Sequence, residues 1–168
     1  ETILNGLKQK LWPVHCVRRT HGWRFHPDCD QRNVDLLVGK GRNREVDSYS
    51  AFYDNGKNAA DELKQKYPFL GQSTGLAERI IAEAEAADCD EIQVDVCGLA
   101  IGFCTSWSAL HARAETFKGK QFRVRLIEDA SRALIINKGD YKRYIDELKA
   151  VEIEIVQTKE VIVAQSGK

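Results

Sequence analysis

Short apolar runs typical of β-strands alternate along the chain with longer stretches that have helical spacing. The strand-like runs occupy residues 12–17, 34–38, 92–97, 122–127 and 152–156. The stretches with apolar residues three or four positions apart predict helices at 58–66, 73–84, 104–114 and 140–148. Helices placed between strands favour parallel pairing with right-handed crossovers. The pattern therefore predicts an α/β fold with a mostly parallel sheet.

Polar residues stand where two of these helices are expected to begin. Ser73 or Thr74 can cap the helix that runs through residue 84, and Asp140 can cap the helix that runs through residue 148. The length of 168 residues suits a single domain over residues 1–168. The sequence contains no methionine, so we expect the chain to be a processed product or part of something longer.

Composition excludes several classes of partner. Lys and Arg number 25, as do Asp and Glu, so the charge balance predicts no nucleic-acid partner. No apolar run approaches the roughly 20 residues that span a bilayer, which predicts no membrane insertion. Five cysteines without a C-x-x-C pair favour a reducing compartment. We therefore expect an intracellular, cytoplasmic protein, with a mitochondrial location as the alternative.

Cys104 stands at the predicted start of a helix, just after the strand-like run at 92–97 and a short loop. Free cysteines are among the most buried residue types, so a packed thiol is one interpretation. A helix N-terminus stabilises a thiolate, and open α/β sheets bind their ligands at the carboxyl ends of strands. Cys104 is therefore also a candidate nucleophile.

Three further clusters carry candidate chemistry. "WPVHC" at 12–16 places an imidazole beside an indole, and Lys40 follows a strand-like run between two glycines. "VDSYSAF" at 46–52 supplies aromatic rings that can line a pocket or cover a sheet edge. Each cluster alone also has a structural interpretation, as a packed tryptophan, a solvated lysine or a covered edge.

Taken together, the clusters resemble a known family. "WPVHC", "EVDSYSAFYDN", "STGLAE", "VCGLA" with the following cysteine, and "LIEDASRA" resemble, in order and spacing, the nicotinamidase branch of the isochorismatase-like hydrolases. The resemblance runs from about residue 6 to residue 161. It implies a three-layer α/β/α domain with a mostly parallel sheet. It also implies hydrolysis of nicotinamide to nicotinate and ammonia, a reaction of NAD salvage.

The resemblance assigns roles to individual residues. Cys104 matches the nucleophile, and Lys40 matches the lysine of a Cys-Asp-Lys triad. The peptide bond between Leu99 and Ala100 matches the cis peptide bond of the family's oxyanion hole. A cis bond there would orient the N–H groups of Ala100 and Cys104 toward the oxyanion. Trp12 and Tyr49 match the aromatic residues that flank the pyridine ring.

A metal ion is also implied, because His15 matches a ligand of the family's zinc or iron. The triad aspartate and an Asp-x-His metal pair precede "WPVHC" in the family, and neither is present in this sequence. Catalytic zinc usually has three protein ligands, so His15 alone cannot hold it. We therefore expect a divalent metal only if the missing ligands are supplied.

The family's first strand, which is central in the sheet, lies in the same missing part. We expect either upstream residues of the same protein or another polypeptide to complete the sheet, so the chain would be an oligomer or a complex subunit. The loop before Cys104 differs as well. The family usually has Thr-Asp-aromatic there, and this chain has Ile101-Gly102-Phe103.

Two hypotheses follow, and the sequence leaves both open. In the first, the chain is most of a nicotinamidase that acts on a small amide through Cys104 and Lys40. In the second, it is a catalytically inactive subunit with a structural role in a larger assembly, with a mitochondrial assembly as one setting. The retained lysine and cysteine favour the first, and the missing part and the changed loop favour the second.

Overall fold

The computed structural model describes residues 2–32 and 34–161. Its strands are β1 (Thr2–Leu4), β2 (Leu7–Gln9), β3 (Gln93–Ile101), β4 (Thr116–Phe117), β5 (Lys120–Gln121), β6 (Arg123–Ala133) and β7 (Glu154–Val156). Its helices are η1 (His21–Trp23), α1 (Asp61–Lys66), α2 (Leu76–Ala86), α3 (Cys104–Ala114) and α4 (Asp140–Lys149).

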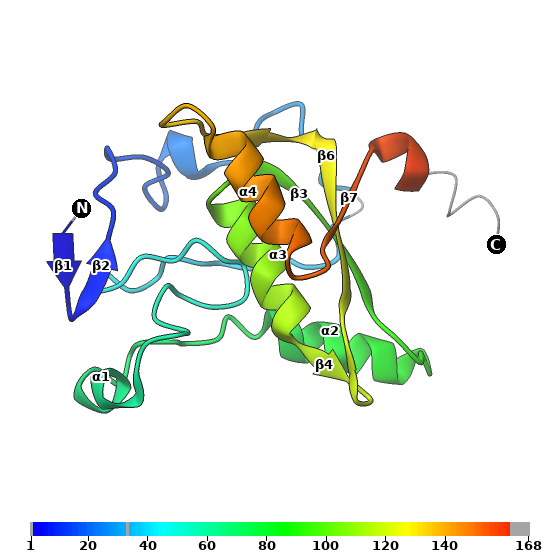
Figure 1. The fold of residues 1–168 in the computed structure, drawn as a ribbon, viewed down its shortest axis with the longest axis horizontal. Helices are drawn as coiled ribbons and strands as arrows, with labels where there is room; N and C mark the ends of the chain where they lie inside the picture. Colours follow the sequence, from blue (N-terminus) through cyan, green and yellow to red (C-terminus); the bar gives the residue numbers. More distant parts are fainter. Residues whose placement is uncertain (1, 33, 162–168) are drawn as a thin grey trace.

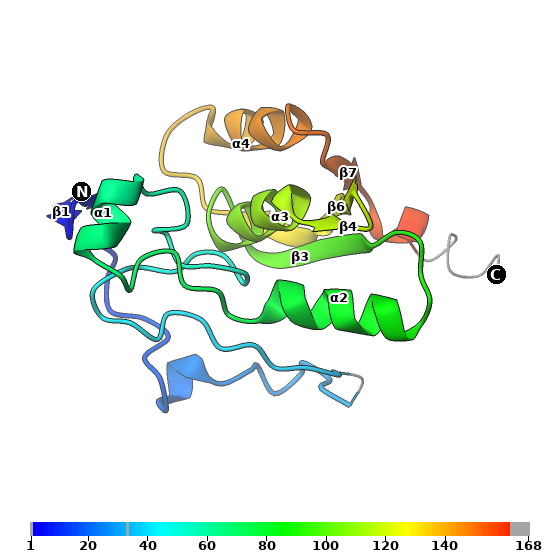
Figure 2. The same cartoon turned by 90° about the horizontal axis from the view of Figure 1, so that it is seen from below.

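The main sheet is parallel and has the order β3-β6-β7. In its register Val94 lies opposite Val124, and Leu126 lies between Val96 and Ile155. Helices flank this sheet. In Figure 2, α3 and α4 lie above β3 and α2 lies below it. The predicted α/β class and the parallel pairing of the strands near 92–97, 122–127 and 152–156 are confirmed.

The core forms because β6 alternates between apolar and charged residues. Side chains of successive strand residues point to opposite faces of a sheet, so Val124 and Leu126 are buried while Arg123 and Arg125 lie on the other face. Ala109 and Ala112 of α3 and Leu148 of α4 belong to the same buried cluster, along with Ala77 of α2. Figure 1 shows α3 and α4 side by side, next to the strands of the sheet.

Ion pairs lie on the opposite face of the sheet. Arg125 donates to both carboxylate oxygens of Asp95 at 2.7 and 2.6 Å. Arg123 lies 3.5 Å from Glu154 and 3.7 Å from Glu91. The Asp95–Arg125 pair connects β3 with β6, and the Arg123–Glu154 pair connects β6 with β7.

The helix starts agree only partly with the predicted caps. Thr74 Oγ1 accepts a bond from the N–H of Leu76 at the start of α2. The capping prediction for Asp140 is wrong. Gly139 precedes α4, and the Asp140 carboxylate accepts bonds from the N–H groups of Ile136 and Asn137 in the preceding turn. Asp140 is the first helical residue, so its carboxylate stabilises the turn that leads into the helix.

Two predicted strands are wrong. Residues 12–17 and 34–38 form no strand, and Val14 and Leu37 are 90% and 63% exposed. A strand exists only where its N–H and C=O groups pair with a neighbour. Among the described residues, neither segment pairs with β3, which is one of the two outer strands of the sheet. The apolar pattern is present in both segments, but no strand of the described residues pairs with them.

The N-terminal hairpin of β1 and β2 was not predicted. Its turn is Asn5-Gly6, with φ of 52° and 78°. Asn-Gly is the strongest short sequence signal for a two-residue hairpin turn, so the signal was present in "LNGL". Within the described residues, no helix is long and apolar enough to cross a membrane.

Candidate active site

Lys40 and Cys104 meet although they are 64 residues apart. Cys104 is the first residue of α3 and follows β3 after the Gly102–Phe103 turn. The Lys40 ammonium lies 3.5 Å from its sulfur and donates to the carbonyl oxygen of Ser48 at 2.6 Å. Lys40 stands on an irregular segment, not at a strand end. The structure therefore brings the two residues together although the strand predicted at 34–38, just before Lys40, does not form.

A single loop, residues 48–55, contacts Lys40 directly and the first turn of α3 through Ser108. Its Ser48 carbonyl accepts from Lys40, and its Ala51 N–H donates to the hydroxyl of Ser108 at 2.9 Å. Ser108 lies one turn into α3 and donates to the carbonyl of Cys104 at 2.7 Å. Each such hydrogen bond contributes about 1 kcal/mol net. Together they hold the first turn of α3 and the lysine against the same loop.

The turn before Cys104 has the backbone that the resemblance implies. The peptide bond between Leu99 and Ala100 is cis. The N–H of Gly102 donates to the Ser106 hydroxyl at 2.8 Å, which closes the turn onto α3. That the N–H groups of Ala100 and Cys104 stabilise an oxyanion stays a prediction.

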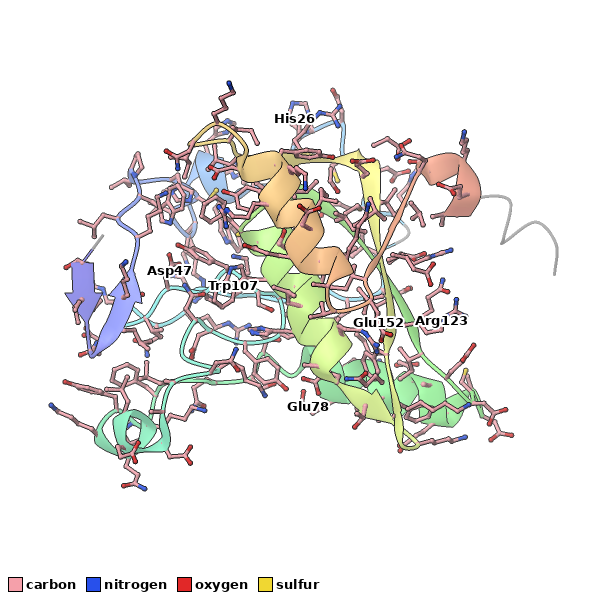
Figure 3. The ribbon with its side chains drawn as sticks, viewed as in Figure 1. His26, Asp47, Glu78, Trp107, Arg123 and Glu152 are labelled. Carbon is pink, nitrogen blue, oxygen red and sulfur yellow. The ribbon has the colours of Figure 1, made fainter. Side chains whose placement is uncertain are left out.

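Trp12 and Tyr49 lie together beside this turn. The indole N–H of Trp12 donates to the Tyr49 hydroxyl at 2.9 Å. Both rings pack edge-on against Phe103, with centroid distances of 4.8 Å for Trp12 and 5.7 Å for Tyr49. Trp107 adds a fourth ring, 5.8 Å from Tyr49, and Figure 3 shows it between α3 and the N-terminal hairpin. Burial is the main reason that the pKa of Tyr49 is raised.

His15 does not join a metal site. Its ring is exposed, and Nδ1 lies 2.6 Å from the carbonyl oxygen of Pro13. In the part of the chain that the structure describes, no group of three His, Cys, Asp or Glu side chains is arranged to hold a metal ion. A catalytic zinc ion needs about three protein ligands. The residues present therefore do not fit a metal, and no chemical step is derived through one.

Two structural features of this site were not predicted. A Cβ built on Gly102 would overlap the ring of Tyr144, so this ring on α4 fills the space beside the turn. His111 of α3 is 5% exposed, and burial lowers its pKa to about 4. Its Nδ1 has no hydrogen-bond partner among the described residues, and its ring packs edge-on against Tyr53 and Trp107. No sequence signal connects Gly102 with Tyr144, which lies 42 positions away.

Comparison with known proteins shows what the chain is similar to. No family model matches it. It is 31% identical over 147 residues to the nicotinamidase of Escherichia coli, covering 88% of this chain and 58% of that protein. It is 28% identical over 155 residues to the nicotinamidase of Acinetobacter baylyi, covering 92% of this chain and 61% of that protein. The chain therefore spans about 60% of the length of these curated relatives.

Solved structures give the same picture. A crystal structure of PnC1 from L. infantum in complex with nicotinate matches with a TM-score of 0.68 and 27% identity over 89% of this chain and 62% of that one. A pyrazinamidase of Pyrococcus horikoshii in complex with zinc matches with a TM-score of 0.60 and 25% identity over 88% of this chain and 63% of that one. An isochorismatase-like hydrolase from Alkaliphilus metalliredigens, at 16% identity and a TM-score of 0.58 over 91% of this chain and 63% of that one, shares the fold.

Proposed function

We propose that this chain, which belongs to the isochorismatase-like hydrolase superfamily, carries the nucleophile of a nicotinamidase-type amide hydrolase. The reaction would convert nicotinamide to nicotinate and ammonia. The observation that supports it most is the Lys40 ammonium 3.5 Å from the sulfur of Cys104 at the start of α3. An ammonium at that distance and a helix N-terminus both stabilise a thiolate.

The proposed reaction has two halves. In the first, the Cys104 thiolate attacks the amide carbonyl carbon, and the N–H groups of Ala100 and Cys104 stabilise the oxyanion. The C–N bond then breaks, and ammonia leaves with an added proton while a thioester remains on Cys104. In the second half, water attacks the thioester and releases the carboxylic acid and the thiol. Trp12 and Tyr49 would flank the pyridine ring.

Proton transfer needs a carboxylate that the described residues do not place beside Cys104. We propose that a strand pairs with the free edge of β3 and supplies an aspartate. That strand would come from upstream residues of the same protein or from another polypeptide. Unpaired strand edges recruit such partners. The family's metal, which the relative from P. horikoshii binds as zinc, would likewise need ligands from outside the described residues.

The proposal extends to domain organisation and cellular location. Residues 1–168 would form one domain that is incomplete at its N-terminus. All five cysteines are free in the structure, and we infer a reducing compartment, the cytoplasm or alternatively the mitochondrion.

A second candidate function is a catalytically inactive subunit of a larger assembly. It is favoured by the turn before Cys104, where Gly102 replaces the family's usual aspartate and the ring of Tyr144 fills the adjacent space. In this alternative the free edge of β3 would be a docking edge, and the strand that pairs with it would carry no aspartate.

Ammonia release from nicotinamide by the full natural protein decides between the two functions. If the proposal holds, Cys104→Ser and Lys40→Met each lower kcat by about 10³-fold or more, as for other nucleophile and base pairs. Cys29→Ser, which removes an exposed thiol, is the matched control and retains the rate. A natural protein that releases no ammonia would favour the inactive subunit. A Cys104→Ser variant that keeps the rate would show that Cys104 is not the nucleophile.

A further inference from the structure

A cleft with a volume of about 350 Å³ lies beside Phe103. Neither Cys104 nor Lys40 lines it. Its walls come from five regions, namely β2 with the residue after it, the loop at 48–55, the Gly102–Phe103 turn, α3, and the start of α4 with the turn before it. Small-molecule pockets begin at about 300 Å³, so the cleft is large enough for a single-ring ligand.

Four aromatic rings line this cleft together with polar and charged side chains. The rings are those of Tyr49, Phe103, Trp107 and Tyr144. The rings pack edge-to-face, with centroids 5.7 Å apart for Tyr49 and Phe103 and 6.2 Å apart for Phe103 and Tyr144. Such walls present ring faces and edges at fixed angles, and they favour a flat aromatic ligand over a puckered one.

Four charged residues line the cleft, namely Lys8, Lys10, Asp140 and Arg143, and Lys10 lies over aromatic rings of the site. Its ammonium lies 4.8 Å from the ring centroid of Trp12 and 5.5 Å from that of Phe103. In the described part of the chain, it has no carboxylate partner. Arg143, the other cation near the start of α4, differs because it already pairs with Asp140 and Glu147. Lys10 is therefore a half-buried cation, held over aromatic rings, without a carboxylate partner among the residues that the structure describes.

We propose that this cleft binds a small planar aromatic carboxylate. The ring would lie among Phe103, Trp107 and Tyr144, and the carboxylate would pair with the Lys10 ammonium. This site is separate from the proposed amide hydrolysis, because the Cys104–Lys40 pair contributes nothing to it. Tyr49 borders both sites, so it is not used to distinguish them.

Calorimetric titration of the full natural protein with benzoate tests this assignment. We expect one benzoate to bind per chain and benzamide, which lacks the charge, to bind at least about tenfold more weakly. Cyclohexanecarboxylate, which keeps the charge but is not flat, should also bind at least about tenfold more weakly. Lys10→Met should weaken benzoate binding by about tenfold or more and leave benzamide binding unchanged, since methionine preserves most of the apolar stem.

Two variants serve as controls. Lys118→Met removes a lysine that also lies over a ring, 5.4 Å from the centroid of Phe117, but that does not line the cleft. It should leave benzoate binding unchanged, and so should Lys40→Met.

Benzoate binding that is lost in Lys40→Met and retained in Lys10→Met would place the ligand beside Cys104 and overturn the proposal. So would the absence of saturable benzoate binding, or equal binding of cyclohexanecarboxylate. A protein that binds benzoate through Lys10 but hydrolyses no amide would support this site while the proposed function fails.

Discussion

The segment from β3 to β7 and the segment before α1 use similar apolar runs with opposite results. Between residues 92 and 156, the runs pair as strands and bury their apolar rows against α3 and α4. Before residue 61, the runs at 12–17 and 34–38 stay irregular and largely exposed. The difference teaches that an apolar run becomes a strand only where a neighbour satisfies its backbone groups.

The contrast is clearest between two leucines. Leu126 in β6 is fully buried between two paired strands, and Leu37 is 63% exposed on an unpaired segment. Both stand in short runs of valine, leucine or isoleucine. The site crosses this boundary, because Cys104 stands on the regular side while Lys40, Trp12 and Tyr49 stand on the irregular side.

Truncating the two leucines should reveal the largest difference in stability between the two segments. In residues 1–168, we expect Leu126→Ala to lower the free energy of unfolding by about 2–5 kcal/mol, through lost burial and a cavity. Leu37→Ala should change it by no more than about 0.5 kcal/mol, as exposed substitutions do. Urea unfolding followed by circular dichroism measures both.

The same two substitutions also test the proposal that a further strand pairs with β3 and completes the sheet. In the full natural protein, where a strand would pair with β3 and bring segment 34–38 into the sheet, Leu37→Ala should cost more than about 2 kcal/mol. Equal costs for Leu37→Ala and Leu126→Ala in residues 1–168 would show that segment 34–38 is already buried there, contrary to the structure.

The sequence was sufficient to predict the regular half of the fold. Period-two and helical patterns predict β3, β6, β7 and the helices, because each of these elements finds its neighbour within the described chain. The same patterns predict strands at 12–17 and 34–38 wrongly, since a pattern does not reveal whether the pairing strand is present. The short hairpin β1–β2 was missed although its Asn-Gly turn was visible in the sequence.

Introducing the family's usual aspartate at Gly102 tests how the turn before Cys104 is held. Gly102 has a φ of 93°, and the Tyr144 ring fills the space that a Cβ would need. We expect Gly102→Asp to lower the free energy of unfolding by about 4 kcal/mol, from overpacking and the unfavourable backbone conformation together. The measurement is again urea unfolding.

A double-mutant cycle separates these two causes. Tyr144→Ala opens the space, so Gly102→Asp should cost at least about 1 kcal/mol less in that background than in the natural one. Gly119, with a φ of 78° and open space around it, gives a matched control. Gly119→Asp should carry only the backbone part of the cost. Equal costs for Gly102→Asp with and without Tyr144 would mean that the ring does not occupy that space.

The sequence predicted only those residues of the site that belong to motifs of the family. Lys40 and Cys104 meet, and Trp12 and Tyr49 bond, because each belongs to a motif with fixed spacing. The close packing of the Tyr144 ring beside Gly102 depends on how α4 packs against the turn, and no local pattern encodes that packing. His15 fits its motif, yet its ring lies at the surface in this structure. A metal site depends on several ligands that converge in space, so one matching residue does not predict it.

The smallest expected effect concerns the buried imidazole of His111. Burial is the largest cause that lowers its pKa from 6.5 to about 4, with Lys57 lowering it further and Asp54 raising it. Above pH 6.5 the imidazole is neutral in both the folded and unfolded chains, and the structure has its full stability. Between pH 6.5 and 4 the unfolded chain takes up a proton that the folded chain excludes, so the free energy of unfolding falls by at most about 3 kcal/mol. His111→Phe, which keeps a ring against Tyr53 and Trp107, should remove this part of the pH dependence.

His26→Phe, at an exposed histidine, should leave it unchanged. Urea unfolding at several pH values between 7.5 and 4 measures the three curves. Parallel curves for the natural chain and His111→Phe would show that His111 is protonated equally easily in both states.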